Sequence, residues 1–223
     1  MVVMTLKANF VAAASGGAPF EAAENLDSVV DMTVAHESEP CEVLPGTPRY
    51  WGADEFMNHD FGDIGRRFEL EDGCIVMTPA PSIRHQRIAR RLINAVEACI
   101  RDNDLDLDVE GPVNYRLNSD TVFAPDIAVF RRDTDSDLYV EPHEIEILAE
   151  VTSTNSNRDR LTKMNRYART KCEWYWIVDQ NTLVIDVHRL DGDLYRQVAA
   201  LTPGTAALLP GPVPLVLDPG TLA

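Results

Sequence analysis

The stretch that decides the fold starts with Pro125-Asp126-Ile127-Ala128-Val129-Phe130. It continues with Ile145-Glu146-Ile147-Leu148-Ala149-Glu150-Val151-Thr152-Ser153 and ends with Trp174-Tyr175-Trp176-Ile177-Val178-Asp179. The first two runs are short and rich in β-branched residues, which is typical of strands. A basic segment, Arg158 to Lys171, lies between the second and third runs and has the pattern of a helix. The stretch therefore predicts two strands, each with one carboxylate candidate, followed by a helix.

Asp126 and Glu150 are the two carboxylate candidates. Side chains alternate along a strand, so Glu150 shares a face with Glu146, Leu148 and Thr152. If the two runs pair, Asp126 and Glu150 project from one sheet face, and two neighbouring carboxylates are hard oxygen ligands that suit Mg²⁺. Taken singly, Asp126 is more simply a turn cap and Glu150 a solvated strand residue.

The helix adds a lysine to this pair. Asn155-Ser156-Asn157 is a suitable N-cap cluster. We expect the apolar stripe that docks on the sheet to be Leu161, Met164 and Ala168. Asp159, Lys163 and Tyr167 form a row beside that stripe, from which Lys163 can lean toward the carboxylates and neutralise charge on a phosphate. The alternative is a solvated Lys163 paired with Asp159.

Several segments in this order resemble the Uma-two (Uma2) family of restriction-endonuclease-like proteins, within the PD-(D/E)XK nuclease superfamily. The segments are Pro125-Asp126, Leu148 to Ser153, Asp159…Lys163…Tyr167-Ala168, Glu173 to Asp179, and upstream Phe68 to Gly73, Met77 to Ser82 and His85. The resemblance covers roughly residues 47 to 218. Two positions depart from the pattern: Thr152 stands where the superfamily has a strand lysine, and Lys171 where the family often has glycine. Lys163 is then the counterpart of the missing lysine.

The resemblance implies a metal-dependent endonuclease that hydrolyses phosphodiester bonds in DNA. Asp126, Glu150 and the main-chain carbonyl of Val151 would bind Mg²⁺, with Mn²⁺ as a substitute, and Lys163 and His85 would join the two carboxylates as catalytic residues. It also implies a homodimer and a cytoplasmic location. Two other functions stay open: a catalytically inactive nuclease-fold module that binds nucleic acid or protein, which Thr152 favours, and a hydrolase of small phosphorylated molecules. Whether DNA or RNA is cut is open too.

Composition indicates a soluble globular domain with an extension. The chain has 223 residues, 45% of them hydrophobic, and no apolar run long enough to span a membrane. Its four cysteines are scattered, which favours a reducing compartment and no zinc site. The net charge of −16 argues against a nucleic-acid partner, but eleven of the twenty Lys/Arg lie in 82–101 and 157–171. These two segments could form a positive rim.

The rest of the chain predicts an α+β fold of restriction-endonuclease-like architecture: a mixed, mostly antiparallel central sheet flanked by helices over 82–101 and 156–170. Residues 1–46 are acidic and lack periodicity, so we expect a disordered arm before a nuclease-like domain at 47–223. Shorter elements are expected as a helix at 52–58, a hairpin around Glu71-Asp72-Gly73, strands broken at Gly111-Pro112, a second hairpin around Asp191-Gly192-Asp193, and an edge strand or tail at 215–217. Asp108 and Glu110 are possible additional acids of the site.

Overall fold

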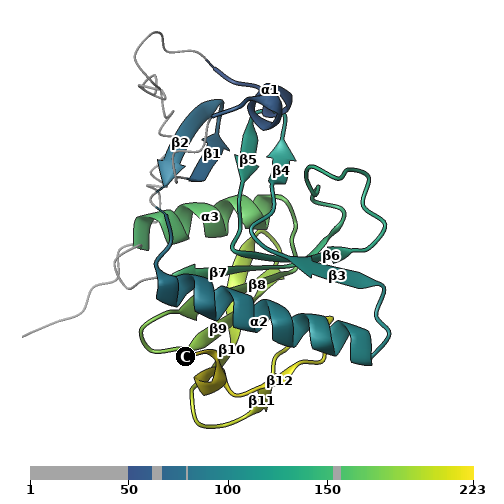
Figure 1. The fold of residues 1–223 in the computed structure, drawn as a ribbon, viewed down its shortest axis with the longest axis vertical. Helices are drawn as coiled ribbons and strands as arrows, with labels where there is room; N and C mark the ends of the chain where they lie inside the picture. The colour runs from purple at the N-terminus through teal and green to yellow at the C-terminus, as the bar shows by residue number, and fades with distance from the viewer. Residues whose placement is uncertain (1–49, 62–66, 79, 153–156) are drawn as a thin grey trace, which may run out of the picture. The chain divides into compact units, whose positions relative to one another are not determined.

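The runs at 127–130, 145–152 and 174–179 form three neighbouring strands of a six-stranded sheet (Figure 1). The computed structural model describes residues 50–61, 67–78, 80–152 and 157–223. In the order β10-β9-β8-β7-β6-β3, the strands are Leu194–Leu201, Ile185–Asp191, Trp174–Asp179, Ile145–Thr152, Ile127–Arg131 and Leu107–Glu110. Only β7 and β8 pair in parallel within this sheet. The expected mixed, mostly antiparallel sheet is therefore confirmed.

Helix α2, Ile83–Asp102, covers one face of this sheet. It begins where Ser82 accepts a hydrogen bond from the His85 backbone N–H, an N-cap that satisfies one of the free amides of the first turn. Its apolar stripe is fully buried and packs with the β7 face that carries Ile147, Ala149 and Val151; it consists of Ile88, Leu92, Val96 and Ile100. The predicted helix is confirmed, and it ends one residue later than expected.

Helix α3, Asn157–Arg169, connects the parallel strands β7 and β8 and covers the other face. The expected docking stripe is partly wrong, because Leu161 is 61% exposed while Tyr167 is completely buried against Leu148 and Tyr175. The helix is rotated so that Lys163 and Tyr167 face the sheet, where Lys163 contacts Glu69 and Glu150 and Tyr167 contacts Glu150. The expected N-cap at 155–157 and the side chain of Asp159 lie outside what the structure describes.

A smaller sheet lies on the α3 side of the central one (Figure 1). In the order β2-β1-β5-β4, its strands are Cys74–Thr78, Arg67–Glu71, Thr121–Phe123 and Tyr115–Asn118, and α1, Ala53–Asn58, packs with it. The predicted hairpin is confirmed as β1–β2. Its turn places both Asp72 (φ 49°) and Gly73 (φ 76°) in the left-handed region, which the Asp-Gly pair favours.

The remaining predicted elements are also present. The stretch 105–117 breaks at Gly111-Pro112 into β3 and β4, which belong to different sheets. The second hairpin is β9–β10, and the C-terminal residues form β11 (Ala207–Leu208), β12 (Val216–Leu217) and the 3₁₀ helix η1 (Pro219–Leu222). Leu217 and Leu222 pack into the core on the α2 side. Lys171 has φ 64°, a conformation suited to the glycine that the resembled family often has there.

Two further expectations concern the chain as a whole. The predicted acidic arm, residues 1–46, lies outside the described residues, so its boundary at 47 stays a prediction. In the described residues, no helix combines the length and the apolar character needed to cross a membrane. Within the same residues Cys74, Cys99 and Cys172 are free cysteines.

Candidate active site

Asp126 and Glu150 lie opposite each other at the end of the β6–β7 pair. Ile127 is in antiparallel register with Ala149, so the residues one step further, Asp126 and Glu150, face one another across the two strands. Each is only 6% exposed. Neither carboxylate is therefore a solvated turn cap or strand residue, and the structure brings the two together as the pairing argument expected.

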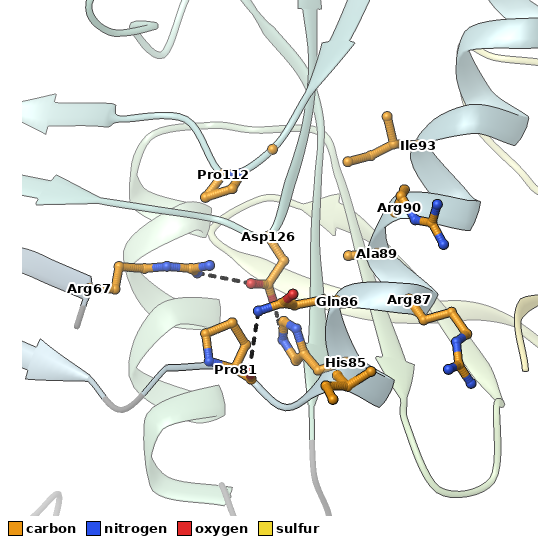
Figure 2. A pocket seen from close by; sticks show the side chains of 12 residues that line it. Arg67, Pro81, His85, Gln86, Arg87, Ala89, Arg90, Ile93, Pro112 and Asp126 are labelled. Carbon is orange, nitrogen blue, oxygen red and sulfur yellow. Dashed lines mark hydrogen bonds and ion pairs between the residues drawn. The ribbon is translucent and has the colours of Figure 1, made fainter. Parts of the chain in front are cut away.

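Three donors hold the Asp126 carboxylate, and two of them, Arg67 and His85, are drawn in Figure 2. Oδ2 accepts hydrogen bonds from His85 Nε2 (2.9 Å) and the Val151 backbone N–H (3.0 Å), and Oδ1 accepts one from Arg67 Nη1 (3.0 Å). Burial by itself would raise the pKa of Asp126, but the hydrogen bond and charge of His85, the Val151 amide and Arg67 together lower this pKa to about 2. Asp126 is consequently ionised at any physiological pH.

Glu150 has the opposite electrostatic character. Its Oε1 accepts hydrogen bonds from Tyr167 Oη (2.8 Å) and Lys163 Nζ (3.2 Å). Burial raises the pKa of Glu150 to about 8; Lys163 opposes the shift, and the nearby charges of Asp126 and Glu69 add to it. Without a bound cation, Glu150 therefore holds a proton at neutral pH.

Lys163 is buried in this cluster, with only 12% of its side chain exposed. Besides Glu150, its Nζ donates to Glu69 Oε1 at 3.0 Å and lies 5.8 Å from the centre of the Phe123 ring. The lysine thus joins the two sheets through carboxylates from β1 and β7. The alternative of a solvated lysine on the surface of the helix is wrong.

Glu69 and Arg67, both on β1, were missed by the sequence reasoning. Glu69 is 4% exposed, and its Oε1 also accepts the Ala124 backbone N–H at 2.9 Å. A weak signal was available, because Glu69 stands between Phe68 and Leu70 in a hairpin strand, where one side of the strand must face the protein. Glu69 joins the cluster because the tertiary structure places β1 beside α3.

Gly111 supports the position of Asp126 from outside the sheet. A Cβ atom at Gly111 would lie 2.0 Å from the backbone oxygen of Asp126 and 2.8 Å from its carbonyl carbon. Real Cβ atoms do not approach backbone that closely, so only glycine allows the loop after β3 to lie against the start of β6.

Other acids stay away from the site. Asp108 and Glu110 are exposed on β3, so the possibility that they extend the cluster is not supported. Within the described residues, the group of acids and histidines whose ligand atoms lie close enough together to share a cation is Asp135, His143 and Glu144. Both Glu144 oxygens, however, accept backbone N–H groups, from Asp135 (2.7 Å) and Glu141 (2.6 Å). Glu144 therefore closes a loop.

The donor set of the main cluster has the chemistry that suits a hard divalent cation, although its three acids do not lie as close together as Asp135, His143 and Glu144 do. Asp126, Glu150 and Glu69 are three buried acids, Lys163 and Arg67 supply positive charge beside them, and His85 is hydrogen-bonded to Asp126. Both hydrogen bonds described for Glu150 fall on Oε1, so Oε2 is the oxygen on which a proton or a cation can reside. Carboxylate oxygens without sulfur or neutral imidazole clusters are typical of Mg²⁺ or Mn²⁺ sites.

Comparison with known proteins gives two findings. The model of the Uma2 family, described as "Putative restriction endonuclease", matches residues 53–219. Among solved structures, the chain is similar to a crystal structure described as a putative nuclease belonging to DUF820 from Anabaena variabilis, with 17% sequence identity, a TM-score of 0.58, and coverage of 77% of this chain and 97% of the other. No curated protein matches the chain.

Proposed function

The chain belongs to the Uma2 family of restriction-endonuclease-like proteins, and we propose on that premise that it is a metal-dependent endonuclease that hydrolyses phosphodiester bonds in DNA. The observation that carries the proposal is the buried cluster at the end of β6 and β7. There Asp126 and Glu150 face each other and Lys163 contacts Glu150 at 3.2 Å. Perturbed carboxylates with a buried lysine are a common arrangement in catalytic sites.

The residues proposed to hold the metal are Asp126, Glu150 and the main-chain carbonyl of Val151. When bound, a divalent cation would supply a lower pKa for bound water and polarise a phosphate oxygen. The protein prepares for it unequally: Asp126 is ionised beforehand, while Glu150 must release its proton before it can bind a cation.

The other side chains have separate tasks in this proposal. Lys163 brings a positive charge that stabilises the negative charge developing on the phosphate. Glu69 accepts a hydrogen bond from Lys163 at 3.0 Å, and this contact would keep Lys163 in place when Glu150 binds a metal cation. His85 contacts Asp126 at 2.9 Å on the side that opens to a cleft, where it can orient water or a phosphate oxygen.

A catalytically inactive module that binds nucleic acid or protein is the second candidate. It is favoured by Thr152 at the strand-lysine position, and by the ion pairs that already neutralise two of the acids, Arg67 with Asp126 and Lys163 with Glu69. A site that balances its own charges can be purely structural. A hydrolase of small phosphorylated molecules would use the same cluster and is separated from a nuclease by the substrate that is turned over.

Calorimetric titration with Mg²⁺ and Mn²⁺ tests the metal site. We expect binding to the wild-type protein, its loss in Asp126→Asn and Glu150→Gln, and no change in Glu97→Gln, which removes an exposed carboxylate from α2. Binding to the two site variants that equals the wild type would show that the metal ligands are wrong.

Nicking of supercoiled plasmid DNA in Mg²⁺ or Mn²⁺ tests the activity, with a panel of nucleotides and sugar phosphates as the small-molecule arm. Lys163→Ala should abolish nicking while metal binding persists. Equal nicking by wild type and Lys163→Ala would point to a contaminating nuclease or another site. Metal binding without turnover of any substrate would favour the inactive module.

A further inference from the structure

A cleft leads from the surface to one side of the acid cluster (Figure 2). It has a volume of about 620 Å³ and lies between the first three turns of α2 and the loop at Gly111-Pro112. Of the three acids only Asp126 lines it, together with its partners Arg67 and His85. A substrate that enters this cleft therefore meets the site at Asp126, whereas Glu150, Glu69 and Lys163 do not line it.

The walls of the cleft combine apolar and cationic side chains. Its apolar lining residues are Pro81, Ile83, Ala89, Ile93 and Pro112. Ile83 is 78% exposed, which is unusual for a large aliphatic residue beside a polar site. Arg87 and Arg90 complete the α2 wall, one turn apart on the same side of the helix.

The arginines of α2 are not equivalent. Arg84 donates to the Gln180 carbonyl (2.6 Å) and Arg91 to the Thr221 carbonyl (3.3 Å), so both are engaged in holding the fold. Arg87 and Arg90 are exposed, and in the part of the chain that the structure describes they take part in no hydrogen bond or ion pair. Of the α2 arginines that the sequence assigned to the positive rim of 82–101 and 157–171, Arg87 and Arg90 are the two that line the cleft.

We infer that this cleft binds one unpaired nucleoside of a DNA strand, with its phosphate at the Asp126 end and a neighbouring phosphate on Arg87 and Arg90. The inference rests on the proposed function and specifies its substrate. The volume is that of pockets that enclose a small molecule, and the apolar wall matches the face of a base. A fully paired duplex would offer phosphates to the arginines but leave Ile83 and Ile93 without a partner. The site therefore favours single strands, frayed ends or extruded nucleotides over intact duplex.

Fluorescence anisotropy in EDTA tests this without any cleavage. The probes are a labelled single strand and a blunt hairpin duplex of equal phosphate number, titrated with the full chain at several salt concentrations. We expect the single strand to bind more tightly. Arg87→Ala/Arg90→Ala should weaken single-strand binding by roughly tenfold or more and lower the salt slope, since phosphate contacts are lost. Ile83→Ser should weaken binding of the single strand and leave that of the duplex unchanged.

The matched control is Arg101→Ala/Arg169→Ala, which removes the same charge from exposed helix positions outside the cleft. Its binding should stay close to that of the wild type. Equal loss in both double variants would mean that net charge, not the cleft, attracts DNA, and tighter binding of the duplex would overturn the inference directly. Failure of the nuclease proposal is distinguishable, because it would appear as selective single-strand binding in EDTA with no metal-dependent cleavage.

Discussion

Replacing Glu150 with glutamine should make the metal-free protein more stable, increasingly so as the pH rises. Glutamine has nearly the same size and keeps an oxygen that can accept the hydrogen bonds from Tyr167 and Lys163. It removes only the ionisable group. Because Glu150 is buried among other acids, the wild-type protein must either keep a proton there or hold a desolvated charge.

The magnitude follows from the pKa of Glu150, which burial raises from 4.5 to about 8. Between these two values the unfolded chain has lost the proton and the folded chain retains it, so wild-type stability is lost as the pH rises through this window. Each pKa unit corresponds to about 1.4 kcal/mol, which gives a loss of about 4 kcal/mol between about pH 5 and about pH 9. Glutamine does not titrate, so the stability difference between the variant and the wild type should grow by that amount.

The assay is urea denaturation in EDTA at a series of pH values, with the free energy of unfolding compared between the two proteins at each pH. Taking the difference cancels the titration of groups that both proteins share. Glu97→Gln, which makes the same substitution at an exposed position of α2, is the control and should not reproduce the gain expected for Glu150→Gln. Mg²⁺ should narrow the gap between wild type and Glu150→Gln by stabilising the ionised wild-type site.

A stability difference that is the same at pH 5 and pH 9 would refute the reasoning. It would mean that Glu150 is solvated or fully compensated by Lys163 in the folded state. The inference that Glu150 is protonated in the metal-free protein would then be wrong, and metal binding would not need to displace a proton from it.

Two further predictions concern the frame of the site and the N-terminal arm. Gly111→Ala should displace the backbone at Asp126 and weaken Mg²⁺ binding, and the overpacked contact should lower the free energy of unfolding by about 1–3 kcal/mol. The control in calorimetry and denaturation is Gly52→Ala, whose Cβ would lie 3.8 Å from the nearest atom. Equal behaviour of the two variants would contradict the close approach at Gly111. Deletion of residues 1–46 should leave the melting temperature of the rest unchanged and tighten DNA binding at low salt, because the acidic arm is expected to add only repulsion; limited proteolysis should release a fragment that starts near Thr47, and a protected arm would show that it packs on the domain.

The sequence by itself predicted the main elements and four of the residues proposed for the site. Alternation along 145–152 and the periodicity of 83–102 are local signals, and each is set by which side of a strand or helix must leave water. Asp126 and Glu150 could be paired in advance because a strand register connects them. The order of the motifs then indicated the family, and with it His85 and Lys163 as their partners.

The tertiary structure alone decided which polar groups are buried and against what. Leu161 is apolar yet exposed, and Lys163 is charged yet buried, because α3 turns toward Glu150 and toward Glu69 from a strand 94 residues earlier. Local periodicity cannot reveal such a contact, since a buried charge is tolerated only where distant parts of the chain supply its partners. The same applies to the Arg67–Asp126 ion pair, to the close approach of Gly111, and to the cleft that leaves Arg87 and Arg90 facing the site while Arg84 and Arg91 hold the fold.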